Sequence, residues 1–119
     1  MKKEELSPMA QNILDMMIST ENVNLIADFY DLPPELRMRI IESTTTVEER
    51  NIEIIRLCIM FYAAGLFKLD DPDKVHEMII KNFVTIMDSF LNHMAKLILM
   101  NRESKFKATI KELIEEEKL

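Results

Sequence analysis

The most extended hydrophobic pattern in the chain lies between Pro72 and Asn101. No glycine and no further proline interrupts this stretch, and its apolar side chains recur every three or four residues. At about 100° per residue, that spacing places them on one broad arc of an α-helix. Because a single neighbouring helix covers a narrower stripe, the arc predicts a central helix packed on at least two sides. The arc consists of Ile79, Ile80, Phe83, Ile86, Met87, Phe90, Leu91, Met94, Leu97 and Ile98.

A second long helix is predicted from Thr46 to Phe67. Thr46 with Glu49 three residues later has the form of a capping box, which typically starts a helix. Apolar residues occupy two opposed sides of this helix, so we expect it to be sandwiched, either by other parts of the chain or by a second chain. Gly65 near its end predicts either a C-terminal cap or a close backbone approach. The side that we expect to meet another copy carries Ile54, Leu57, Phe61 and Ala64.

Three shorter helices are predicted before it, within residues 8–42. Ser7 followed by Pro8 is typical of a cap and a first helical position. Ser19 to Asn22 separates the first short helix from the second and supplies a new cap. Pro33-Pro34 ends the second and begins the third, because the residue before a proline is pushed out of the helical region.

The last segment, Ser104 to Leu119, has an apolar pattern of its own. Its residues Phe106, Ile110, Leu113 and Ile114 would lie roughly 150° from the central arc if the helix continued as a straight rod. The chain can resolve this mismatch by breaking near Asn101–Ser104, or by letting the end of the rod pack on a different molecule. We choose the break and predict a separate peripheral helix over residues 104–119.

These elements predict one all-α domain spanning residues 1–119. We expect a compact bundle of five or six helices around an antiparallel central hairpin, residues 46–101. The composition agrees, because 48% hydrophobic and 30% charged residues are a globular balance, and one glycine leaves little turn chemistry for a sheet. The single cysteine excludes an internal disulfide and fits a reducing compartment. With no apolar leader and no uncharged run of about 20 residues, we expect a cytoplasmic protein without a membrane span.

No pattern in the sequence is typical of a catalytic, cofactor or metal site, so we expect no enzyme and no bound cofactor or metal. His76 and His93 are too far apart along one helix to share an ion. Cys58 lies in an apolar run without an activating base, and burial should raise the pKa of its thiol. The acidic groups have a simpler role as residues that favour helix N-termini; they are Glu48, Glu49, Glu53, Asp70, Asp71 and Asp73.

The expected function is a non-enzymatic protein-interaction module: an adaptor, inhibitor or regulatory subunit. Apolar helix faces and ten methionines exceed what so short a chain needs for a core, and this surplus predicts an apolar helical surface for a protein partner or a homodimer. Phe106 and Ile110 join the candidate interface. The formal charge of −6 disfavours nucleic acid. The alternative is a DNA-binding regulator that uses the short helices around Arg37 and Arg39.

Overall fold

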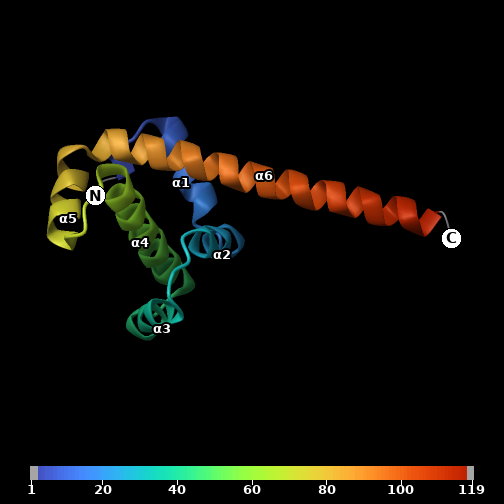
Figure 1. Cartoon of the computed structure of the whole chain (residues 1–119), viewed down its shortest axis with the longest axis horizontal. Helices are drawn as coiled ribbons and strands as arrows, with labels where there is room; N and C mark the ends of the chain where they lie inside the picture. Colours follow the sequence, from blue (N-terminus) through green and yellow to red (C-terminus); the bar gives the residue numbers. More distant parts are fainter. Residues whose placement is uncertain (1–2, 118–119) are drawn as a thin grey trace.

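The computed structural model describes residues 3–117, and within them it contains helices and no strand (Figure 1). The predicted all-α class is therefore confirmed. A short 3-10 turn, Lys3–Glu5, precedes six α-helices. The helices are α1 (Pro8–Met17), α2 (Thr20–Phe29), α3 (Pro34–Ser43), α4 (Val47–Phe67), α5 (Pro72–Lys81) and α6 (Phe83–Glu117).

The predicted helix starts are confirmed by the hydrogen bonds of their caps. The hydroxyl of Ser7 accepts from the N–H of Ala10 at 3.2 Å, and Ser19 caps α2 in the same way. At α4, Thr46 Oγ1 accepts from the N–H of Glu49 at 3.1 Å. The Glu49 carboxylate accepts in return from the N–H and hydroxyl of Thr45. These hydrogen bonds lower the pKa of Glu49.

The core lies where α4 meets the first half of α6. α4 contacts α2, α3, α5 and α6, while α1 packs across α6 on another side (Figure 1). Helix α6 is thus covered from several directions over this half, as its broad apolar arc predicts. The largest fully buried side chains are Phe90, Met17, Ile26, Ile86, Leu91, Met94 and Ile98.

The predicted single helix over residues 72–101 is wrong, because the chain bends at Asn82. The Asn82 side chain and its backbone N–H both donate to the carbonyl of Met78, at 3.2 and 3.0 Å, and so end α5. The Asn82 carbonyl then accepts from the N–H of Ile86 and begins α6. Asparagine competes in this way with continued helical bonding. The bend lays α5 against α4, so α4 meets the predicted single helix as two separate helices, α5 and α6, and not as one antiparallel partner.

The predicted break near Ser104 is also wrong. α6 runs without interruption for 35 residues, which is about 52 Å. No glycine or proline occurs in it, and residues 102–117 are rich in Glu and Lys, which favour a helix. The mismatch of the two apolar faces is resolved in the other way: the end of the helix leaves the body of the molecule (Figure 1).

This projecting end dominates the shape of the molecule. The longest dimension is 59 Å against 32 and 28 Å for the other two. The radius of gyration is 16.9 Å, whereas a compact chain of this length has about 13.5 Å. The chain as a whole is therefore not the compact bundle that the sequence predicts.

Gly65 has neither of its two predicted roles. It lies inside α4, and a Cβ added to it would meet no atom within 4 Å. The cap is Lys68, which adopts the left-handed conformation with φ 53°. The N–H of Leu69 then donates to the carbonyl of Ala64 at 3.0 Å and closes the helix end.

Candidate interaction surface on the projecting helix

The projecting end of α6, residues 102–117, is here called the tail, and residues 3–101 are called the body. Each of its side chains is exposed. Four large apolar residues lie on one side of it and form the tail stripe: Phe106, Ile110, Leu113 and Ile114, exposed by 67%, 40%, 56% and 48%. At 100° per residue they lie within about 60° on either side of Ile110. Leu99 and Met100, also exposed, extend this stripe onto the body.

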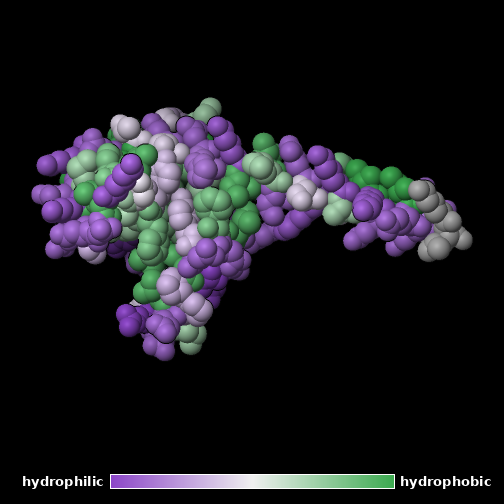
Figure 2. Space-filling model, viewed as in Figure 1, coloured by the Kyte–Doolittle hydropathy of each residue, from purple (hydrophilic) through white to green (hydrophobic). Residues whose placement is uncertain are grey.

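The tail stripe faces away from the core. The buried side of α6, which includes Phe90 and Met94, lies roughly 150° around the helix from it. Figure 2 shows hydrophobic surface along the upper edge of the tail's far part, and hydrophilic surface below it. No other part of residues 3–117 folds back over the stripe (Figure 1). The stripe is therefore not covered by any part of residues 3–117 of the same copy.

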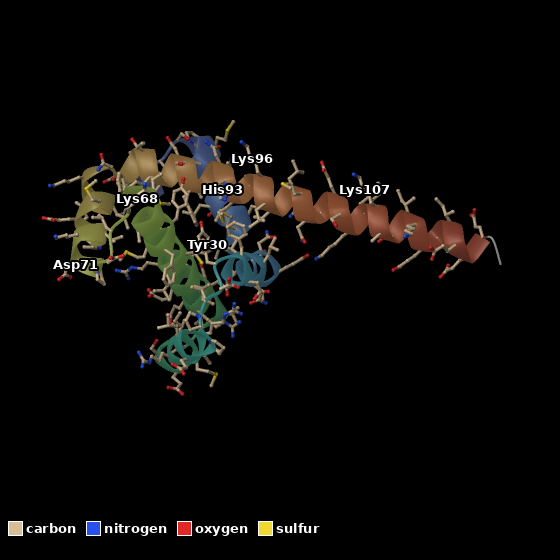
Figure 3. The ribbon with its side chains drawn as sticks, viewed as in Figure 1. Tyr30, Lys68, Asp71, His93, Lys96 and Lys107 are labelled. Atoms are coloured by element: carbon tan, nitrogen blue, oxygen red, sulfur yellow. The ribbon has the colours of Figure 1, made fainter. Side chains whose placement is uncertain are left out.

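Charge is segregated along the tail. The first part carries Arg102, Lys105, Lys107 and Lys111 with one acidic residue, Glu103. The second part carries Glu112, Glu115, Glu116 and Glu117. Lys105 forms an ion pair with Glu21 of α2 at 3.0 Å and ties the base of the tail to the body. Lys107 lies beyond that tie (Figure 3). The tail is thus basic near the body and acidic near its end.

The structure leaves little of the predicted interface on α4 free. Ile54 is buried, and Leu57 and Ala64 are half-buried and packed against the core. Phe61 is 44% exposed. Of the six residues predicted for the interface, Phe61, Phe106 and Ile110 are exposed, and the last two belong to the tail stripe.

An open groove of about 650 Å³ lies beside α4 and α5. Its walls are mainly apolar, from Ile52, Ile59, Met60, Ile79, Ile80 and Phe83, and its polar residues are Glu5, Glu53, Arg56 and His76. Glu53 is engaged by Arg56 at 3.4 Å. Sequence reasoning missed this groove, because the bend at Asn82 that turns α5 against α4 was not expected.

The other candidate chemical groups lie apart from the groove. His93 packs edge-on against Phe29 and stacks over Tyr62, whose hydroxyl bonds the hydroxyl of Ser89. Burial raises the pKa of the Cys58 thiol to about 12, and it also raises the pKa of Tyr30. Neither group is an activated nucleophile at neutral pH. Tyr30 and His93 both lie on the side where α2 and α6 approach α4 (Figure 3). Within residues 3–117, no three metal-ligating side chains gather.

The two arginines of the DNA-binding alternative differ in their surroundings. Arg37 is half-buried and its guanidinium pairs with Asp28 of α2 at 2.9 Å. Arg39 is exposed on the same helix. Arg37 thus connects α3 to α2. Because its guanidinium is already paired with Asp28, it gives the DNA-binding alternative no additional support.

α6 also meets a length and hydropathy criterion for a membrane span, with a mean hydropathy of 1.2 over an 18-residue window. Of that window, 39% is buried within the molecule. The core helix of a soluble protein meets the same criterion, so the finding is weak evidence for a span.

Comparison with known proteins adds nothing to this geometry: no family model, curated protein or solved structure matches the chain.

Proposed function

We propose that this protein is a non-enzymatic protein-interaction module, an adaptor, inhibitor or regulatory subunit, which binds a protein partner through the tail stripe. The observation that carries the proposal is the exposure of Phe106, Ile110, Leu113 and Ile114 on a helix that projects from the core. Large contiguous apolar surface is uncommon on soluble monomers and is typical of interaction sites.

The energetics of the tail support the same proposal. A helix of this length without tertiary contacts is marginal in water, because most helical stability in proteins comes from packing an amphipathic face. The part of α6 before Asn101 packs in the core, and the tail continues the helix that begins there. This part of α6 covers none of the tail stripe. A partner that buries four large apolar side chains would gain about 1.5–3 kcal/mol for each fully buried one before the costs of association.

The test compares two variants with the same charge change on opposite sides of the tail. Ile110→Glu places a carboxylate in the middle of the stripe. Ala108→Glu places one about 160° around the helix, on the polar side. Both residues are exposed in one copy of the chain, so neither substitution should unfold the body, as thermal denaturation followed by circular dichroism measures.

Tagged wild type and Ala108→Glu protein should retain the same proteins from the cells that naturally contain this chain, as measured by quantitative mass spectrometry. Ile110→Glu should lose them, because a buried carboxylate opposes the apolar contact. Equal retention by all three proteins would contradict the proposal.

A further inference from the structure

We infer that the partner of the tail is a second copy of this chain, whose tail lies antiparallel to the first. This inference rests on the proposed function, since it names the partner of the same stripe. It is carried by the order of charges along the tail, which the apolar stripe alone does not explain.

Reversing one tail against another brings unlike charges together. Arg102, at the base of one tail, then lies beside Glu116, near the end of the other. Because the pairing is symmetric, each favourable contact occurs twice. Two copies in the same direction would instead align basic with basic and acidic with acidic, which is unfavourable between neighbouring helices.

The heptad positions of the stripe make this comparison specific. Phe106 and Leu113 occupy one apolar position of the repeat, and Ile110 occupies the other. With the two-fold axis level with Ala108, Phe106 packs against Ile110 of the second copy. Arg102 and Glu116 occupy the same flank of the stripe, so Arg102 lies beside Glu116 of the second copy.

The same register covers the rest of the exposed apolar side. Met100, which is 67% exposed on the body, lies beside Ile114 of the second copy. Leu99 lies near the end of that copy's tail. The antiparallel arrangement therefore also covers Leu99 and Met100, the exposed apolar residues next to the tail stripe.

A parallel arrangement has more unfavourable contacts. It places Glu103 against Glu103 and Glu117 against Glu117 in the apolar seam, and it places Arg102 beside Lys107 twice. The antiparallel arrangement places Glu103 opposite Leu113 and Glu117 opposite Leu99, so these carboxylates do not meet each other in the seam. It leaves one pair of like charges flanking the seam, between the two copies of Lys107. The balance of charges thus favours opposite directions.

The first experiment measures mass by light scattering and sedimentation at high micromolar concentration. Wild type and Ala108→Glu should have twice the 14.0 kDa of one chain, and Ile110→Glu should have the mass of one chain. A monomeric wild type overturns the inference, and so does an Ile110→Glu protein that remains dimeric.

The second experiment tests direction by exchanging charges. Arg102→Glu creates two repulsive contacts in the antiparallel dimer and should raise its dissociation constant on the order of tenfold. Glu116→Arg should do the same. The double variant, which has the wild-type net charge, should restore the wild-type constant. In a parallel dimer, Arg102→Glu would remove a repulsion from Lys107 and tighten association, and that result overturns the inference.

The two proposals fail differently. If the purified chain is a monomer but Ile110→Glu still loses proteins from the cell, the stripe binds another protein and the self-association is wrong. If wild type instead binds vesicles of anionic phospholipid and no protein, both proposals are wrong, and the stripe is a membrane-binding surface.

Discussion

Single residues explain where the helices of this protein begin and end. Serine, threonine and aspartate caps start α1, α2, α4 and α5 as their sequences predict. The ends are less regular, because Lys68 adopts the left-handed conformation that glycine usually supplies, whereas Asn82 ends α5 with φ −123°. A non-glycine residue in the left-handed conformation costs free energy. The chain thus carries a small local cost at the end of α4, while its glycine lies three residues earlier.

Gly65→Ala should stabilise the protein by about 0.5–1 kcal/mol. Glycine inside a helix is less favourable than alanine by that amount, since it loses more backbone freedom on folding. The space around Gly65 accepts the added methyl group without contact. Chemical denaturation with urea measures the change, with Ala64→Gly as a control that should move stability in the opposite direction. A destabilised Gly65→Ala protein would show that the glycine serves a contact outside this chain.

At the scale of elements, α4 and α6 each have two apolar faces, and these faces are covered differently in the two helices. α4 has both faces largely covered, because α2, α3, α5 and α6 all pack on it. α6 has one face buried over its first half and an opposite face exposed over its second half. The same sequence feature, an apolar pattern on two sides, therefore leads to a sandwiched helix in one case and to a projecting helix in the other.

Leu57→Glu should unfold or destabilise the protein by about 2 kcal/mol or more, without producing a folded monomer. Leu57 is half-buried and packs against the core of the same chain, so a carboxylate there loses apolar contact and is desolvated. Thermal denaturation followed by circular dichroism gives the stability, and sedimentation gives the mass. Phe61→Glu is the matched control, because Phe61 is exposed on the same helix face. A Leu57→Glu protein that stays folded but dissociates would place the dimer contact on α4.

At the scale of the whole molecule, the body and the tail make separate contributions. The body contains the buried core, whereas the tail contributes length and surface. Within the described part of the chain, an exposed ion pair between Lys105 and Glu21 connects the tail to another helix. Exposed ion pairs contribute at most about 1 kcal/mol. The tail is therefore nearly independent of the stability of the body.

Deleting residues 104–119 should leave the body folded with a thermal midpoint within a few degrees of that of the Ile110→Glu variant. The deletion removes no buried side chain among the described residues. It should also abolish self-association. Comparison with Ile110→Glu is the proper control, since that variant keeps the tail but is expected to be monomeric. Loss of the folded spectrum on deletion would show that the tail belongs to the core.

The sequence by itself determined the helical class, the starts of α1 to α5 and which residues share a face. These properties depend on hydrogen bonds and side chains within about four residues, so the local pattern contains them. It also determined the apolar identity of Phe106 and Ile110 and the order of charges around them. Only the tertiary structure decided that the chain bends at Asn82 and runs straight through Ser104. Both choices depend on which distant residues cover each face of the helix, since an asparagine or a serine permits a helix end without requiring one.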